Sequence, residues 1–358
     1  MIRGQANWEL ETGNWKREGE RPSWSNRRAE SRFGLPGASD VIDLEAVRTA
    51  HARIRPHIVR TPLVRSDWLS EKSGAEVRLK LESLQVTHSF KARGALNALT
   101  QIVETSAGNP PTIVTASAGN HGRAIAWAAE RLGLRATIFT PAGAPRAKLD
   151  PIARHGADLR AEARDYEDAE ARALEFARTS GARFVSPYND DAVIAGGGTV
   201  AVEILEDWPE VEVIAVPVGG GGLVSGIALA AARIAPAVQV FGVEAEASPA
   251  FSAALKAGRP VRVDVRPTIA DGLGGNLEEN SRTWEYVRDL VRGVVTVSEE
   301  ELRQATRELA AAEHLIAEGA GAAAIAAVLA RRIPGAQTAV VLSGSNIDTG
   351  LLADLLRG

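Results

Sequence analysis

The sequence contains no cysteine, which excludes disulfide bonds and thiolate metal sites. It has no run of about 18 or more apolar residues, and no apolar signal segment opens it, so neither a membrane span nor a secretion signal is predicted. The formal net charge of −4 gives no sign of nucleic-acid binding, and four of the six histidines, His51, His57, His155 and His314, are scattered without the spacing of metal ligands. The 358 residues, 45% of them hydrophobic, are enough to bury a large core. We therefore expect a cytoplasmic protein that binds a small molecule, with no nucleic-acid, membrane or metal partner.

Short apolar or β-branched runs alternate with segments of helical periodicity along most of the chain. This pattern predicts an α/β fold of largely parallel twisted sheets flanked by helices. The predicted strands span residues 77–81, 112–115, 135–140, 183–186, 211–218, 238–243, 294–297 and 338–342. The triplet Gly196–Gly198 is predicted as a flexible turn before a helix over 200–205.

The first 38 residues differ from the rest of the chain. They hold three of the seven tryptophans among arginine, glutamate, asparagine and glycine, and they show no apolar periodicity. We expect a poorly ordered tail there. A short arm that packs on a partner subunit is the alternative interpretation.

Lys91 lies in the segment Ser-Phe-Lys-Ala-Arg-Gly-Ala, between an extended apolar stretch and a segment of helical spacing. A lysine at such a junction can be desolvated and aimed at a carbonyl, as Schiff-base chemistry requires. The alternative is a solvated lysine near a helix start, where a cation is slightly unfavourable.

The strand predicted over 211–218 runs into four successive glycines, and a helix is predicted to follow from Leu223. The glycines are Gly219, Gly220, Gly221 and Gly222. They allow several N–H groups to converge beside a helix start, which predicts a phosphate-binding loop. The loop is neither a Walker loop, because no Gly-Lys-Ser/Thr follows, nor a dinucleotide fingerprint. A turn that only packs a strand on a helix is the alternative.

Two further polar turns follow predicted strands. The first consists of Ser117, Ala118, Gly119, Asn120 and His121. Free N–H groups and a hydroxyl at its predicted helix start suit a carboxylate, although the same residue types are common helix caps. The second turn begins at Ser343, whose hydroxyl can donate one well-placed hydrogen bond or cap the next helix.

These four segments, in this order, resemble the threonine dehydratase and serine racemase family of pyridoxal-phosphate (PLP) enzymes, which belongs to the fold type II group of the tryptophan synthase β-subunit. Members typically carry a Ser-Phe-Lys-x-Arg-Gly-Ala block, a Ser-Ala/Ser-Gly-Asn-His block, a tetraglycine loop and a Ser/Cys-Gly-x-Asn block. All four are present here, and the match spans about residues 42–356. Residues 269–273 and 318–321 also resemble a family loop near the cofactor and a helix start that faces it.

The resemblance implies a two-domain α/β fold. A large PLP-binding domain would comprise residues 39–110 and 190–358, and a small domain would comprise residues 111–189. The amino-acid substrate would bind in the cleft between them, where closure of the small domain excludes water. A homo-oligomer, most simply a dimer, is also expected.

The resemblance further implies roles for the matching residues. Lys91 would hold PLP through a Schiff base, and Phe90 would pack on the ring of the cofactor. Asn120 would hydrogen-bond the ring hydroxyl, and Ser343 would face the pyridine nitrogen. The phosphate would be held by Gly219, Gly220, Gly221, Gly222 and Leu223. The substrate carboxylate would be held by Ser117, Ala118, Gly119, Asn120 and His121.

The residue at position 343 bears on the reaction. A neutral hydroxyl cannot keep the pyridine nitrogen protonated, which favours β-elimination over transamination. Lys91 is the expected base for the α-proton, so Lys91 and Ser343 are the expected catalytic residues. L-threonine or L-serine would then give a 2-oxo acid and ammonia. Racemases of the family carry a serine where this chain has Ala118, whose methyl group cannot carry a proton, so a dehydratase is favoured.

Other readings of the same site stay open. The β-hydroxy amino acid can be hydroxyaspartate, phenylserine or a hydroxyectoine-derived compound, because side-chain pockets are built from scattered loops. The reaction can be racemisation of serine or a PLP-dependent β-replacement. A non-catalytic descendant that binds the cofactor or a metabolite for regulation is the remaining alternative.

Three positions depart from the family pattern, and one of them is Ala320, where a serine is common. The cation site of the family usually combines a glutamate, here Glu244, with an aspartate where this chain has Ala250. A hard divalent cation needs several oxygen ligands, so we expect no metal. Gly197 stands where relatives often have glutamine.

Overall fold

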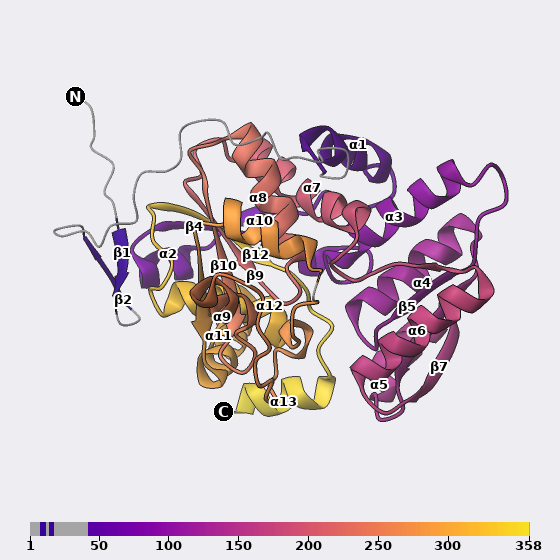
Figure 1. Cartoon of the computed structure of the whole chain (residues 1–358). Helices are drawn as coiled ribbons and strands as arrows, with labels where there is room; N and C mark the ends of the chain where they lie inside the picture. Colours follow the sequence, from indigo (N-terminus) through magenta and orange to yellow (C-terminus); the bar gives the residue numbers. More distant parts are fainter. Residues whose placement is uncertain (1–7, 12–13, 18–41, 279, 358) are drawn as a thin grey trace.

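The structure is a computed structural model that describes residues 8–11, 14–17, 42–278 and 280–357 (Figure 1). Its strands are β1 (Trp8–Glu11), β2 (Asn14–Arg17), β3 (Leu63–Arg65), β4 (Glu76–Leu81), β5 (Ile113–Ala116), β6 (Ala136–Pro141), β7 (Asp158–Ala163), β8 (Arg183–Phe184), β9 (Val213–Pro217), β10 (Gln239–Ala245), β11 (Gly293–Val297) and β12 (Gln337–Leu342).

The α-helices are α1 (Leu44–Ile54), α2 (Asp67–Ser73), α3 (Lys91–Thr105), α4 (Asn120–Leu132), α5 (Arg146–Ala153), α6 (Tyr166–Ser180), α7 (Asp191–Asp207), α8 (Gly222–Ile234), α9 (Ala250–Ala257), α10 (Arg282–Leu290), α11 (Glu299–Glu313), α12 (Gly319–Leu329) and α13 (Thr349–Arg357). Two 3₁₀ turns are η1 (Glu82–Leu84) and η2 (Asp271–Leu273). Among the described residues, no helix combines the length and the apolar content needed to cross a membrane.

Two parallel sheets organise the fold. A six-stranded sheet has the order β11-β10-β9-β12-β4-β3, in which only β3 is antiparallel to its neighbour. A four-stranded sheet has the order β7-β6-β5-β8 and is parallel throughout. The second sheet and helices α4, α5 and α6 lie together at the right of Figure 1. The predicted α/β fold with largely parallel sheets is confirmed.

Helices cover both faces of the six-stranded sheet. Ile214 and Val341 belong to a core on one face with helices α7, α8 and α10. Their neighbours Ala215 and Val340 belong to a core on the other face with α11 and α12. Successive strand residues point to opposite faces, so a sheet covered on both sides needs the continuous apolar runs that the sequence shows.

All eight predicted strands are present, and the structure adds β3 and β7. Strand β7 escaped prediction because its sequence, Asp-Leu-Arg-Ala-Glu-Ala, is charged, as is typical of a strand at a sheet edge. The strands of the second sheet lie between residues 113 and 184. The boundaries of the two predicted domains stay a prediction. The tail predicted for residues 1–38 lies outside the described residues, apart from β1 and β2, which pair with each other and were not predicted.

The prediction of a flexible turn at Gly196–Gly198 is wrong, because these residues lie inside α7 and are buried. A Cβ atom on Gly196 would lie 2.6 Å from the Cα atom of Gly94 in α3. One on Gly198 would lie 2.8 Å from the carbonyl oxygen of Gly226 in α8. The glycines therefore allow three helices to pack at backbone contact, a tertiary need that local sequence does not display.

Four charged side chains form a buried cluster beneath the start of α3. They are Lys80, Glu82, Arg93 and Glu203, whose side chains are at most 2% exposed. Arg93 donates to Glu82 at 2.8 Å and to Glu203 at 2.7 Å, and Lys80 donates to Glu203 at 2.6 Å. Two positive and two negative charges thus compensate one another and connect β4, η1, α3 and α7.

Replacing Arg93 with methionine is expected to lower the free energy of unfolding by about 3–5 kcal/mol, because two buried carboxylates lose their partner. Arg65→Met is the matched control, since Arg65 pairs with Asp67 at the surface and its loss should change almost nothing. Denaturant unfolding followed by circular dichroism measures both. Similar effects of the two substitutions would contradict the importance of the buried cluster.

Two neighbouring glycines of α7 offer a second comparison. Gly196→Ala should destabilise the protein, because the new Cβ atom meets backbone that cannot move aside. Gly197→Ala should be neutral, or stabilising by up to about 1 kcal/mol, because its Cβ atom would have no neighbour closer than 3.5 Å and alanine favours helix. Thermal unfolding of both variants checks the difference, and an equal loss at both positions would refute it.

Candidate active site

Lys91 begins α3, and its side chain turns toward the segment that follows β8. Its Nζ atom donates to the carbonyl oxygen of Pro187 at 2.7 Å and lies 5.1 Å from the centre of the Phe90 ring. The residue as a whole is half-buried, but its amine is enclosed by protein. Burial lowers the pKa of the amine to about 8, and the charge of Glu318 opposes this shift. Near neutral pH a usable fraction of the amine is therefore an uncharged nucleophile.

The glycine loop between β9 and α8 leaves no room for side chains. Gly221 has a φ of +87°, which favours glycine. A Cβ atom on Gly220 would lie 2.2 Å from the ring of Tyr188, and one on Gly219 would lie 3.0 Å from the carbonyl oxygen of Gly272. The loop precedes the first turn of α8, whose N–H groups suit a phosphate. Leu223 contributes backbone there, because its side chain belongs to the core.

The turn before α4 is equally tight. The hydroxyl of Ser117 accepts from the N–H of Gly119 at 3.1 Å. A Cβ atom on Gly122 would lie 2.5 Å from the carbonyl oxygen of Ser117, so the chain needs glycine there. The first N–H groups of α4, from Asn120 onward, have no partner within the helix. They can donate hydrogen bonds to an anion such as a carboxylate.

Asn120 links this turn to two other parts of the site. Its amide nitrogen donates to Glu318 at 2.6 Å, and its amide oxygen accepts from Asn346 at 2.6 Å. Burial raises the pKa of Glu318 to about 7, although the hydrogen bond from Asn120 opposes the rise. A Cβ atom at position 344 would lie 2.2 Å from the carboxylate of Glu318, so a larger residue there would displace this side chain. Neither Glu318 nor Asn346 was among the predicted site residues.

His121 is buried beside the reactive lysine. Its Nε2 atom lies 3.2 Å from the carbonyl oxygen of Val185, and its Nδ1 atom has no hydrogen-bond partner among the described residues. Burial and the nearby charge of Lys91 lower the pKa of His121 to about 3. The imidazole is therefore neutral at ordinary pH and does not supply a proton.

Ser343 follows β12 and is buried against the start of α3. Its carbonyl oxygen accepts from the N–H of Phe90 at 3.0 Å, so its position relative to Lys91 is set by the backbone. The hydroxyl of Ser89, also fully buried, has no partner among the described residues. Unpartnered buried polar atoms indicate that a polar group is accommodated beside them.

An ion pair joins the two sheets next to Glu318. Lys148 of α5 pairs with Asp271 of η2, and both charges influence the pKa of Glu318. The turn η2 packs on the glycine loop, and Gly272 approaches Ala320 at the start of α12. This edge of the site is therefore formed by both sheets. Only the general position of η2 and α12 near the site was expected from the sequence.

Glu244 has a structural task in this chain. Its carboxylate accepts hydrogen bonds of 2.7 to 2.9 Å from the N–H groups of Phe251 and Ser252 and from the hydroxyl of Ser252. Burial raises its pKa to about 7 although these hydrogen bonds oppose the shift. Within the described part of the chain, no group of three or more His, Cys, Asp or Glu side chains is arranged to hold a metal ion.

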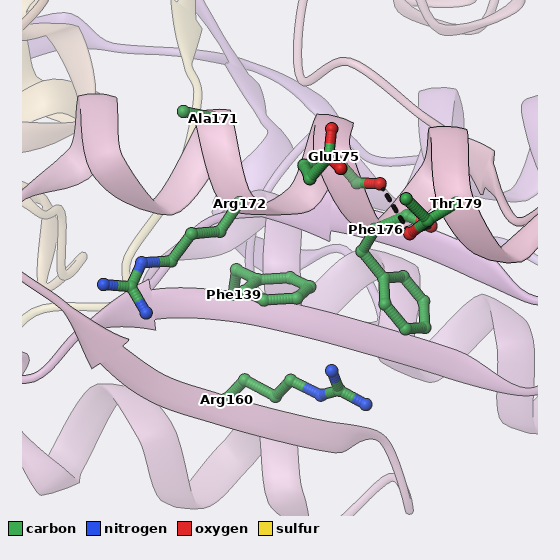
Figure 2. A pocket seen from close by; sticks show the side chains of 7 residues that line it. All are labelled: Phe139, Arg160, Ala171, Arg172, Glu175, Phe176 and Thr179. Atoms are coloured by element: carbon green, nitrogen blue, oxygen red, sulfur yellow. Dashed lines mark hydrogen bonds between the residues drawn. The ribbon is translucent and has the colours of Figure 1, made fainter.

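A pocket of about 460 Å³ lies elsewhere, between α6 and strands β6 and β7 (Figure 2). The guanidinium of Arg160, which lines the pocket, lies 5.5 Å from the ring centre of Phe139 and 4.7 Å from that of Phe176. None of the predicted site residues lines this pocket. We therefore place the functional site around Lys91.

The predicted segments thus meet in one place. Phe90, next to Lys91, contacts the Ser343 turn through its backbone N–H. Asn120 and His121 contact the same region through Glu318 and Val185. The glycine loop adjoins it through Tyr188, the residue after the acceptor of Lys91. Ala118 presents only a methyl group, and Leu223 points into the core.

Comparison with known proteins identifies the family. The family described as pyridoxal-phosphate dependent enzyme matches residues 54–344. An L-threonine ammonia-lyase of Thermotoga maritima is 42% identical over 88% of this chain and 79% of its own length. The catabolic L-threonine dehydratase TdcB of Escherichia coli is 36% identical over 90% of this chain and 97% of its own. The structure of maize serine racemase superposes with a TM-score of 0.81 at 31% identity, covering 88% of this chain and 97% of that one.

The residues present fit the cofactor of that family. An enclosed lysine with a lowered pKa suits an aldehyde, and a loop in which a Cβ atom on Gly220 or Gly221 would clash suits a phosphate. Two buried polar atoms in these segments, the hydroxyl of Ser89 and the Nδ1 atom of His121, have no hydrogen-bond partner among the described residues. The match covers most of the chain, and the fold, the site and the comparisons agree: the chain belongs to the pyridoxal-phosphate dependent enzymes.

Proposed function

We propose that the chain is a PLP-dependent lyase that converts L-threonine or L-serine into a 2-oxo acid and ammonia. The enclosed, partly neutral amine of Lys91 beside the glycine loop is the observation that carries this proposal. The relatives named L-threonine ammonia-lyase and L-threonine dehydratase support it over most of the chain. For threonine the products are 2-oxobutanoate and one ammonia, which together contain all the atoms of the substrate.

The cofactor, when bound, stabilises negative charge at the α-carbon of an amino acid. Lys91 would attach it covalently, Phe90 would pack on its ring, and residues 219–223 would hold its phosphate. Asn120 would hydrogen-bond its ring hydroxyl. That amide is oriented for the task by its hydrogen bonds to Glu318 and Asn346.

Proton transfer is assigned to Lys91. When its Nζ atom is not bonded to the cofactor, the lowered pKa allows it to accept the proton from the substrate α-carbon. The turn 117–121 would hold the substrate carboxylate through the N–H groups at the start of α4, so that the α-proton faces the lysine. The β-hydroxyl would then leave as water with that proton, which returns Lys91 to its neutral form. The enamine that is released reacts with water to give the oxo acid and ammonia.

Ser343 would face the pyridine nitrogen of the cofactor. A hydroxyl is neutral, so it can hydrogen-bond that nitrogen but cannot compel it to stay protonated. This weaker stabilisation favours rapid loss of a β-substituent over transamination. The buried position of Ser343, fixed by its backbone bond to Phe90, supports such a role.

Serine racemisation is the second candidate, because the fold matches maize serine racemase closely. A racemase needs a second proton carrier on the face opposite the lysine. Ala118 cannot supply one, and the neutral His121 has a pKa too low to do so. The elimination reaction is therefore preferred. Location in the cytoplasm, a homodimer, and the two-domain division at residues 111–189 complete the proposal.

The first experiment is the release of keto acid from PLP-loaded protein supplied with L-threonine and L-serine. We expect 2-oxobutanoate and pyruvate, and a loss of at least about a thousandfold in kcat for Lys91→Ala. Lys72→Ala, at an exposed lysine of α2, is the matched control and should keep full activity. Formation of D-serine at a rate equal to or above that of pyruvate would favour the racemase instead.

The pH dependence of cofactor attachment tests the lowered pKa. Only the neutral amine attacks an aldehyde, and with a pKa of about 8 roughly one amine in ten is neutral at pH 7. The rate of attachment should rise about tenfold from pH 7 to 9 and then level off. Because the charge of Glu318 raises the pKa of Lys91, Glu318→Gln should move the midpoint to lower pH.

Stopped-flow absorbance on mixing cofactor-free protein with PLP measures this rate. Lys91→Ala serves as the blank, since it should show no covalent attachment. A rate that keeps rising past pH 10 without a plateau would mean that the pKa of Lys91 is that of an ordinary lysine.

A further inference from the structure

One short segment, Ser186–Asn189, contacts both ends of the proposed cofactor site. The carbonyl oxygen of Pro187 accepts from the amine of Lys91 at 2.7 Å. The next residue, Tyr188, places its ring against Gly220 of the glycine loop. Adjacent residues of the backbone therefore contact the group that binds the aldehyde and the loop that binds the phosphate.

The contact between Tyr188 and the loop is close. A Cβ atom on Gly220 would lie 2.2 Å from two ring carbons of Tyr188, and one on Gly222 would lie 3.0 Å from its Cα atom. Gly220 is also held from another direction, since its carbonyl oxygen accepts from the hydroxyl of Thr283 at 2.8 Å. The peptide at Gly220 is thus held between a flat ring and a hydrogen bond.

Further hydrogen bonds hold the segment itself in place. The hydroxyl of Ser186 accepts from the N–H of Asn189 at 3.0 Å. The side chain of Asn189 donates to Glu278 and accepts from the N–H of Arg282 at 2.8 Å. Arg282 directly precedes Thr283, so the segment and the far side of the glycine loop share one support. The Tyr188 ring therefore has little freedom to move.

We infer that Tyr188 is a positioning residue for the phosphate end of the cofactor, where its ring orients the N–H groups of the glycine loop. The preceding carbonyl of Pro187 orients Lys91, so the segment sets the separation between the two attachment points. The phenol oxygen is not needed for this task, because the contact is made by ring carbons. This inference rests on the roles proposed above for Lys91 and the glycine loop.

The test separates the two ends of the cofactor by using three probes: PLP, pyridoxal, which lacks the phosphate, and inorganic phosphate. Dissociation constants are measured by protein fluorescence and by the shift in melting temperature. Tyr188→Leu should weaken the affinity for PLP and for inorganic phosphate about tenfold or more, because misoriented N–H groups lose charge-assisted hydrogen bonds. Its affinity for pyridoxal should stay within about threefold of the wild type.

Two variants make the comparison specific. Tyr188→Phe keeps the ring and should restore wild-type affinity for all three probes. Lys91→Ala should show the opposite pattern: it should lose its affinity for pyridoxal and keep its affinity for inorganic phosphate. If Tyr188→Leu does not yield folded protein, as judged by its melting temperature without ligand, Tyr188→Met serves in its place. Its volume is closer to that of the ring, but its flexible chain offers no flat surface.

The outcomes divide clearly. Unchanged phosphate affinity in Tyr188→Leu, or an equal loss for pyridoxal and phosphate, would overturn the positioning role. A loss in Tyr188→Phe as large as that in Tyr188→Leu would also overturn it, since the phenol would then be the active part. Failure of the wild-type protein to bind PLP would instead refute the proposed cofactor roles, a result that the variants cannot mimic.

Discussion

The buried cluster of Lys80, Glu82, Arg93 and Glu203 is the interaction on which the arrangement around the reactive lysine depends. Any one of these charges alone in the interior would be strongly unfavourable, but hydrogen bonds of 2.6 to 2.8 Å compensate all four. Arg93 lies two residues after the lysine that begins α3. The interaction that neutralises these charges therefore also holds the start of α3 against β4 and α7, and with it the position of the reactive amine.

The site around this lysine draws on both sheets. Its polar turns follow the carboxyl ends of β5, β9 and β12, and α3 begins shortly after β4. The parts are then joined across the two sheets by two contacts, Asn120 with Glu318 and Lys148 with Asp271. The turn proposed to hold the substrate carboxylate thus follows a strand of one sheet, whereas Lys91 and the loop proposed to hold the phosphate follow strands of the other. This is the arrangement that a substrate joined to a cofactor requires, because its two ends need different chemistry.

The sequence predicted what depends on neighbouring residues. Apolar runs predicted the strands, and four glycines before a helix predicted the loop, because both patterns lie within a few neighbouring residues. It could not reveal contacts such as that of Asn120 with Glu318, which lie 198 residues apart, or the hydrogen bond from the Lys91 amine to the carbonyl oxygen of Pro187, 96 residues away. The glycines at 196–198 were misassigned for the same reason. Glycine favours turns locally, but here close approach to Gly94 and Gly226 decides, and that approach exists only in the folded chain.

The shared carboxylates of the buried cluster also constrain how this protein can evolve. Glu203 serves both Arg93 and Lys80, so a change at any of these positions strands a charge unless a second mutation accompanies it. Single substitutions at such coupled positions are therefore unfavourable, and each is expected to cost stability. New substrate preferences can arise more readily in the turns at 117–121 and 269–273, which border the site without belonging to the cluster.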